Sequence, residues 1–167
     1  MPQGHDNYDQ LTNVFASVFS EHPANIALLD LDANLLAVNG AWSRFAEDNG
    51  LRRGYEFAGA NYLAATEPGA MAGDEYARQA YVGLLGVMRA GLPKFTMVYP
   101  CHSPTEQRWF RMWVQPQTPE AAAIVVAHSF LGPTAPSADQ EEQETTGGAS
   151  TPFELHAGRW PDLSIWR

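Results

Sequence analysis

The chain has 167 residues, 45% of them hydrophobic, and a formal net charge of -9 at pH 7. This length and composition predict one domain of ordinary size with a substantial core. The acidic balance and the single lysine, Lys94, argue against a nucleic-acid partner, because phosphate binding needs clustered Lys and Arg. With one cysteine, no apolar run of membrane-spanning length and no secretion signal, a cytoplasmic protein without a membrane partner is expected.

The first predicted element is an amphipathic helix over Tyr8 to Glu21, within an N-terminal segment that covers residues 1–24. Its apolar residues follow helical spacing and are Leu11, Val14, Phe15, Val18 and Phe19. Pro23 ends the helix, because the residue before a proline avoids helical dihedral angles. The apolar face is expected to cover the sheet of its own domain, to pack against a second copy, or both.

Residues 25–50 predict two short strands joined by a tight turn and followed by a short helix. Asp30 to Asn34 form the turn, because Asp and Asn side chains can bond to their own backbone there. Asn39 and Gly40 end the second strand, apolar residues at helical spacing follow, and Asn49-Gly50 supplies a C-cap.

Residues 51–71 lack a long periodic run and are rich in Gly and Ala, so short helical turns and loops are expected there. Asp74 to Ala90 predicts the longest helix of the domain, with one apolar side and an acidic first turn. Gly83 and Gly86 inside this helix each cost about 1 kcal/mol relative to alanine. Their presence indicates that a ligand or the sheet packs close to the helix backbone.

The second half of the chain predicts three strands, around Phe95 to Tyr99, Trp109 to Val114 and Ile124 to Ser129, with a hairpin loop from Cys101 to Gln107 between the first two. Several of these strands are apolar on both faces, so the sheet must be covered on both sides. Trp109 and Trp113 alternate with Phe110 and are interpreted as interface residues on the opposite face.

After Gly132 the composition changes. Residues 133–150 contain no large apolar side chain and four acidic ones, which is typical of a flexible linker. Residues 151–167 form a tail that concentrates large apolar side chains, namely Phe153, Leu155, Trp160, Leu163, Ile165 and Trp166. This tail is expected either to fold back on the domain or to bind a separate output protein, because aromatic anchors dominate binding hot spots.

The order of these elements resembles that of the PAS domain family. The segment LLDLDANLLAVNGAW is similar to the strand pair and helix that open a PAS domain. GANYL at Gly59 to Leu63, the helix from Asp74 to Gly91, and the segments FTMVYPCHSPTEQRWFRMWVQP and AAAIVVAHSF look like the remaining helices and the last three strands. The resemblance covers residues 25–130. It implies an α/β (α+β) fold for residues 25–132, with a five-stranded antiparallel sheet, short flanking helices and the N-terminal amphipathic helix.

The same resemblance implies a sensory or regulatory protein in signal transduction. Such a protein would bind a small ligand in an apolar pocket and signal through homodimer or partner contacts. The length leaves no space for a catalytic output domain, so the output is expected to come from another polypeptide. The alternative is a ligand-free PAS adaptor for protein-protein interaction. An enzyme is not expected, because no arrangement of nucleophile, base and acid is visible.

The cofactor stays unknown, because the best-known PAS cofactor sites do not match. In flavin photoreceptors of the LOV group a cysteine bonds to the flavin, but Gly59-Ala60-Asn61-Tyr62 has a tyrosine at that place. Haem sensors of the oxygen-sensing kinase type take a histidine from the long helix, which has none here, and leave His128 of the sheet as a conceivable ligand. Cys101 does not match the chromophore cysteine of the photoactive yellow protein group, and with His102 and His128 it falls short of a convincing metal-ligand set.

The implied pocket lies between the helices and the sheet. Its candidate lining residues are Trp42, Phe45, Asn61, Tyr62, Tyr81, Leu84, Phe110, Met112 and His128. The apolar members are equally consistent with plain core packing. Asn61 is the leading polar candidate because a buried amide needs a partner, and His128 is the second because an imidazole titrates near neutral pH.

Overall fold

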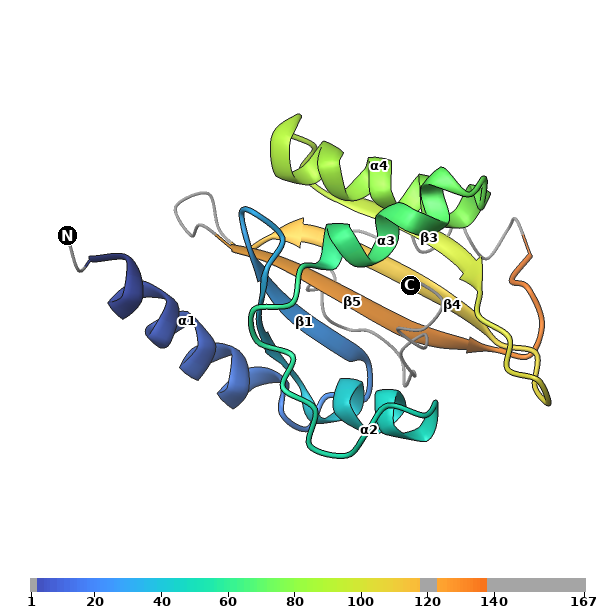
Figure 1. The fold of residues 1–167 in the computed structure, drawn as a ribbon, viewed down its shortest axis with the longest axis horizontal. Helices are drawn as coiled ribbons and strands as arrows, with labels where there is room; N and C mark the ends of the chain where they lie inside the picture. Colours follow the sequence, from blue (N-terminus) through green and yellow to red (C-terminus); the bar gives the residue numbers. More distant parts are fainter. Residues whose placement is uncertain (1–2, 118–122, 138–167) are drawn as a thin grey trace.

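Five antiparallel strands form the centre of the protein, seen here in a computed structural model that describes residues 3–117 and 123–137. The strands are β1 (Asn25–Asp30), β2 (Leu35–Val38), β3 (Phe95–Pro100), β4 (Trp109–Pro116) and β5 (Ala123–Gly132). Their order across the sheet is β2-β1-β5-β4-β3, which places the last strand of the chain beside the first (Figure 1). The predicted fold class, with its five-stranded antiparallel sheet and flanking helices, is confirmed.

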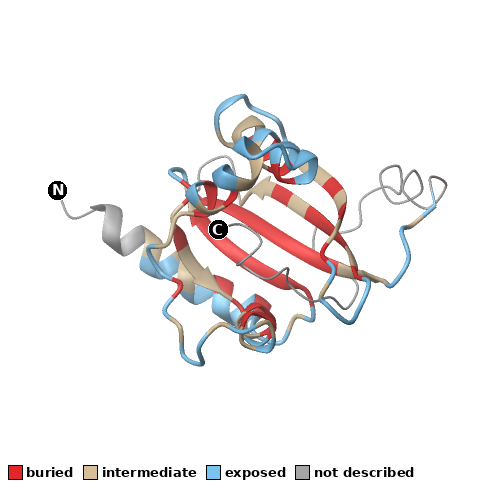
Figure 2. Cartoon of the chain, turned by 45° about the vertical axis from the view of Figure 1, so that its right-hand side comes forward, coloured by how far each residue is buried: buried red, intermediate tan, exposed pale blue. Residues whose placement is uncertain are grey.

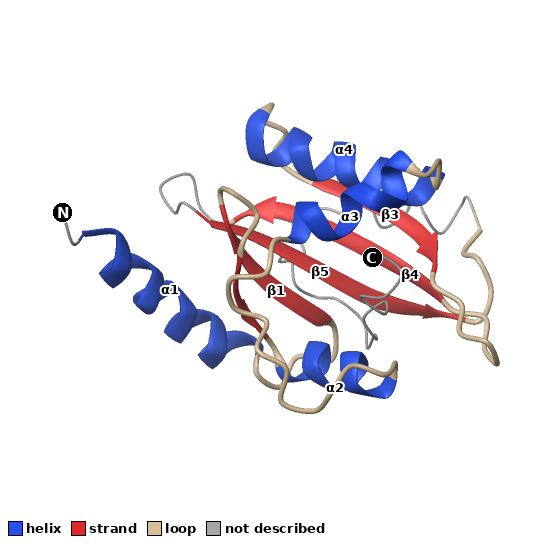
Figure 3. Cartoon of the chain, in the orientation of Figure 1, coloured by secondary structure: helices blue, strands red, loops and turns tan. Residues whose placement is uncertain are grey.

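Four helices complete the described structure (Figure 3). They are α1 (Gln3–Phe19), α2 (Gly40–Asp48), α3 (Tyr62–Met71) and α4 (Glu75–Arg89). Helices α2, α3 and α4 belong to the layer on one face of the sheet, called here the inner face. Helix α1 packs on the opposite, outer face, where Phe15 and Phe19 meet Ile26 and Leu28 of β1. Within the described ranges, no helix is both long and apolar enough to span a membrane.

The β1-β2 hairpin turns as its sequence predicts. Oδ1 of Asp30 accepts hydrogen bonds from the backbone N–H groups of Asp32 (2.9 Å) and Asn34 (2.8 Å). The same turn is held from the other side, because the backbone N–H of Tyr62 donates to the carbonyl oxygen of Ala33 at 2.8 Å. Since Tyr62 is the first residue of α3, this contact fixes where α3 begins over the inner face.

One buried side chain joins three of the four elements that precede α3. Asn39 is 3% exposed and caps α2, with its Oδ1 accepting from the backbone N–H of Trp42 at 3.1 Å and of Ile26 at 3.0 Å. Its Nδ2 donates to the carbonyl oxygens of Ala24 (2.8 Å), Phe19 (3.2 Å) and His22 (3.3 Å). The end of α1, the start of β1 and the start of α2 therefore share one carboxamide.

Two local predictions differ from the structure. The N-terminal helix begins at Gln3 rather than Tyr8 and ends at Phe19, before the residues that lead to Pro23. Residues 51–71 were expected to hold only short turns, but they include the ten-residue helix α3, which contains Pro68. Pro68 is the seventh residue of this helix and has no N–H, so α3 lacks the backbone hydrogen bond that another residue there would donate to the carbonyl oxygen of Ala64. The tail 151–167 and most of the linker 133–150 lie outside the described residues.

The two glycines of α4 have different close neighbours, and only Gly83 faces the sheet. A Cβ atom built on Gly83 would collide with the ring of Phe95, whereas one built on Gly86 would meet the flexible end of the Leu92 side chain. We expect Gly83→Ala to destabilise the protein by about 1–3 kcal/mol, because overpacking outweighs the gain of about 1 kcal/mol in helix propensity. Gly86→Ala should cost less. Urea unfolding of both variants checks this, and an unchanged or raised stability of Gly83→Ala would contradict it.

The shared carboxamide of Asn39 gives a second prediction. Asn39→Ala should lower the free energy of unfolding by about 3 kcal/mol or more, because it removes a helix cap and leaves buried backbone groups without partners. Asn61→Ala is the matched control, since Asn61 also caps a helix but is only half-buried, and it should cost about 1 kcal/mol. Equal losses in a urea titration would show that the buried bonds of Asn39 add nothing beyond capping.

Candidate functional site

A histidine lies between two tyrosines in the buried layer between helices and sheet. Nδ1 of His128 on β5 is 2.5 Å from the hydroxyl oxygen of Tyr99 on β3, and its Nε2 is 3.1 Å from the hydroxyl oxygen of Tyr62 on α3. All three side chains are at most 4% exposed. The three residues come from distant parts of the sequence and form one hydrogen-bonded chain across the inner face.

Burial keeps all three residues of this hydrogen-bonded chain uncharged. Burial lowers the pKa of His128 well below its ordinary value, so its imidazole is neutral. Burial also raises the pKa of Tyr62 and Tyr99, and for Tyr99 the neighbouring Tyr62 and Cys101 add to the increase, while Arg108 opposes it. Both hydroxyls therefore keep their protons at neutral pH.

The number of protons indicates which groups donate in the hydrogen bonds between Tyr62, His128 and Tyr99. Two hydroxyls and a neutral imidazole carry three protons, and the two hydrogen bonds of the chain use two of them. The shorter contact, at Tyr99, is typical of a hydroxyl donor, which favours Tyr99 donating to Nδ1 and the Nε2–H of His128 donating to Tyr62. The hydroxyl proton of Tyr62 is then not used in either of these two hydrogen bonds.

Asn25 is the second polar feature of the inner face. It is 0% exposed and lies opposite His128 in the pairing of β1 with β5. Neither Oδ1 nor Nδ2 of its side chain has a hydrogen-bond partner among the described residues. Leaving a buried amide unpaired costs about 1–3 kcal/mol, so its presence needs an explanation beyond folding.

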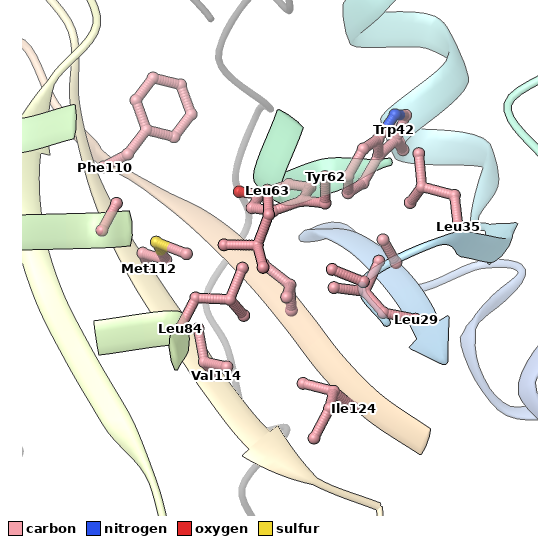
Figure 4. Packing of buried hydrophobic residues seen from close by; sticks show 14 of the residues in the cluster. Leu29, Leu35, Trp42, Tyr62, Leu63, Leu84, Phe110, Met112, Val114 and Ile124 are labelled. Carbon is pink, nitrogen blue, oxygen red and sulfur yellow. The ribbon is translucent and has the colours of Figure 1, made fainter. Parts of the chain in front are cut away.

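Aromatic rings surround the polar chain. Tyr62 contacts Trp42 with ring centroids 6.4 Å apart, and Tyr99 stacks on Phe110 at 5.9 Å. Phe110 in turn contacts Phe45 at 5.8 Å. Figure 4 shows Leu84 of α4 beside Met112 and Val114 of β4, and each is fully buried. The polar groups therefore lie in a dry, apolar setting in which their hydrogen bonds are strong.

Most of the predicted pocket residues come together in this core. Eight of the nine belong to it or pack against it, and these are Trp42, Phe45, Tyr62, Tyr81, Leu84, Phe110, Met112 and His128. Tyr81 is only partly buried. Asn61 is placed differently. Its Oδ1 accepts from the backbone N–H of Ala64 at 2.9 Å and its Nδ2 donates to the carbonyl oxygen of Asp32 at 2.8 Å, so both groups of its amide serve the cap of α3.

Sequence reasoning missed Tyr99 and Asn25. Tyr99 fits the alternating pattern of its predicted strand, and Asn25 stands at the boundary of the first predicted strand. Both lie at inward-facing positions of predicted strands, and a polar residue at an inward position is itself a signal. That signal could have identified Asn25 before the structure was known.

Arg108 and Cys101 form a separate buried contact at the start of β4. Arg108 is 5% exposed, donates through Nε to the carbonyl oxygen of Cys101 at 2.7 Å and through Nη1 to Oδ1 of Asn49 at 3.2 Å. Its guanidinium lies over the ring of Phe45 at 5.2 Å from the centroid. Since Asn49 is the C-cap of α2, the cation also lies at the negative end of that helix. The contact attaches α2 to the β3-β4 hairpin.

The described residues outside the polar chain include a small surface cleft and no cluster of metal ligands. Among residues 3–117 and 123–137, no three His, Cys, Asp or Glu side chains come together as metal ligands. A surface cleft of about 40 Å³ lies between α2 and the segment after it, lined in part by Glu47, Arg52 and Tyr55. This volume is far below the several hundred Å³ of a typical small-molecule pocket.

The buried imidazole makes stability depend on pH. Because the folded state holds His128 neutral while the unfolded chain takes up a proton near pH 6.5, its contribution is complete above that pH and is lost as the pH falls below it. We expect a slope of up to about 1.4 kcal/mol per pH unit from this group. Urea unfolding of His128→Gln between pH 7 and about pH 5 should show a shallower decline. His102→Gln, at an exposed histidine, should keep the wild-type slope, and identical slopes in all three proteins would contradict the assignment.

Comparison with known proteins identifies the fold. No family model matches the sequence. An uncharacterized 104.1 kDa protein in the hypE 3' region of Rhodobacter capsulatus is 36% identical over 121 residues, which are 71% of this chain and 12% of that protein. The chain thus spans only a small part of the length of this relative.

Solved structures give the clearer match. The PAS domain of BvgS from Bordetella pertussis superposes with a TM-score of 0.51 and 14% identity, over 83% of this chain and 96% of that domain. A PAS domain from a two-component sensor histidine kinase (TM-score 0.41, 16% identity, 73% and 98% coverage) and one from an HTR-like protein of Haloarcula marismortui (0.39, 12%, 74% and 99%) are more distant. The strand order, the helical layer and the match to nearly the whole BvgS domain show that this chain has the PAS fold.

Proposed function

We propose that the chain is a sensory module that binds a small uncharged polar molecule at Asn25, Tyr62, Tyr99 and His128. The single observation that carries the proposal is Asn25, whose fully buried amide has no partner within the described structure and lies opposite His128. A protein that used this position only for folding would gain stability from an apolar residue there. An unpaired buried amide at this position is therefore better explained by a role in binding a ligand.

The chemistry of the surrounding groups restricts the ligand. Asn25 offers two N–H donors and one carbonyl acceptor. All the groups of the cluster are neutral, and an ion would lose its hydration without gaining a charged partner. A small amide, or a carboxylic acid in its protonated form, satisfies both the donors and the acceptor. The proposal assigns the protein no catalytic role.

The position of Asn25 also supplies a route for the signal. Asn25 lies between Ala24 and Ile26, and both of these residues bond through their backbones to the side chain of Asn39. The same carboxamide holds the end of α1. A ligand bound to Asn25 therefore contacts the start of β1, to which α1 is attached. It can shift α1 only if it binds more tightly to one position of α1 relative to the sheet than to another. Altered contacts of α1 with a second copy or a partner would be the output.

A ligand-free adaptor remains the second candidate, because a specific observation favours it. The inner face is well filled, with Trp42, Leu84, Phe110 and Met112 at 0% exposure. In that case the Tyr62-His128-Tyr99 chain would only fix the geometry of the core. Helix α1 would then supply the association surface, since Val14 and Val18 on it are at least half exposed.

Asn25→Leu separates the two candidates. We expect this variant to be more stable than the wild type by about 1–3 kcal/mol without ligand, because it removes an unpaired buried amide. Native mass spectrometry of the purified wild-type chain should show a retained small molecule, and a panel of uncharged amides and carboxylic acids should raise its melting temperature. Asn25→Leu should lose the retained mass and weaken binding at least about tenfold, which corresponds to one lost hydrogen bond.

The control for this experiment is Asn61→Asp, which keeps a capping side chain and lies outside the polar cluster. It should retain ligand and affinity. If the wild-type protein has only the mass of its own chain and no compound of the panel raises its melting temperature, the sensor proposal is wrong. The ligand-free adaptor is then the remaining candidate.

A further inference from the structure

The outer face of β3, β4 and β5 is a second surface with unusual chemistry. Because side chains alternate along a strand, the outward residues of β4 are those between Phe110, Met112 and Val114. They pair with outward residues on both neighbouring strands, with Trp113 opposite Thr96 and Ala127, and Arg111 opposite Val98 and Ser129. These residues form one continuous patch, called here the outer patch.

Helix α1 covers a different part of this face. Phe15 and Phe19 pack on β1 and β2, in a cluster that extends to Ala123, Val125 and Ala127 on the outer face of β5, and Figure 1 shows α1 on the side of β1. Trp113 is the residue of β4 that touches the edge of this apolar cluster. The strands β4 and β3 therefore extend past the helix that the structure describes on the outer face.

The outer patch contains buried polar atoms that need partners. Oγ1 of Thr96, Nε1 of Trp113 and Oγ of Ser129 are inaccessible to solvent and have no hydrogen-bond partner in residues 3–117 and 123–137. Figure 2 shows that most residues of the central strands are buried. Each unpaired buried group costs about 1–3 kcal/mol, so three of them on one surface indicate a bound segment that offers polar backbone as well as apolar side chains.

The patch is also cationic. Nζ of Lys94, the single lysine of the chain, lies 5.6 Å from the ring centroid of Trp113, and Arg111 contributes a second positive charge. The segment that leads to the C-terminal tail carries the opposite charge, at Asp139, Glu141, Glu142 and Glu144. The tail itself supplies the aromatic side chains that fill hydrophobic sites, notably Trp160 and Trp166.

The connection is long enough for the tail to return. β5 ends at Gly132, opposite Trp109 in the pairing with β4, so the chain leaves the sheet beside the outer patch. A flexible chain as long as residues 138–150 would have an average span of roughly 20 Å, whereas adjacent strands are only about 4.8 Å apart. An intramolecular partner at this range has an effective concentration in the millimolar range.

We propose that residues 151–167 bind the outer patch of the same chain and cover β3, β4 and β5 opposite the ligand site. The tail inserts Trp160 or Trp166 beside Trp113, and its backbone bonds to Thr96 and Ser129. This contact goes beyond the proposed sensory function and does not depend on it. It gives the domain an internal occupant that competes with a second copy or a partner for the sheet.

Photo-crosslinking in the full-length chain tests the proposal. A benzophenone amino acid replaces Gln115, a partly buried outward residue of β4, and the matched control places it at Arg78, an exposed position on α4. Chains with light and heavy isotopes are mixed before irradiation, and the products are mapped by mass spectrometry. We expect crosslinks from position 115 to residues 151–167 within chains of one label, and none to the tail from position 78.

A variant of the tail completes the experiment. Trp160→Ala combined with Trp166→Ala should lower the yield of the crosslink at least about tenfold, while the fold of the domain is retained. Crosslinks that join light to heavy chains would show that a second copy occupies the patch and would overturn the proposal. Crosslinks that avoid residues 151–167, or that persist equally in the double variant, would also overturn it.

Discussion

The arrangement of this domain depends on a single carboxamide. Asn39 bonds to the end of α1, the start of β1 and the first turn of α2, and no water is needed to satisfy its donors and acceptor. A buried amide with all its groups bonded fixes one geometry, because any displacement of one element leaves a buried donor or acceptor unpaired. The segment from the end of α1 to the first turn of α2 is thereby held in one arrangement.

Two buried amides differ in whether the fold alone explains them. Asn39 and Asn25 are both almost fully buried and lie close to the same strand start. Asn39 has partners for every polar group, whereas Asn25 has none in the described structure. A fold can explain the first and is weakened by the second. The proposed ligand site therefore includes a residue that lowers the stability of the fold, and such a loss of stability is common at functional sites.

Local features of this fold could be predicted from sequence, and features that depend on strand register could not. The Asp30 turn, the Asn39 break and the alternating strands of the second half depend on residues close in sequence, and each is found where it was expected. The polar chain depends on Tyr62, Tyr99 and His128 meeting from three distant elements, and no spacing in the sequence encodes that meeting. Asn61 illustrates the same limit, because its sequence neighbourhood suits a ligand contact and a helix cap equally well, and only the positions of Asp32 and Ala64 decide for the cap.

The sheet itself links the two proposed surfaces. On β5, His128 points inward between Ala127 and Ser129, which point to the outer patch, so the inner and outer residues share one short stretch of backbone. A ligand that moves His128 must tilt this stretch, because the imidazole is held at both nitrogens and cannot adjust alone. The side chain of Ser129 then moves relative to Arg111 and Trp113 on the neighbouring strand. Coupling between ligand and tail needs only this local tilt, provided that each occupant prefers a different tilt of β5.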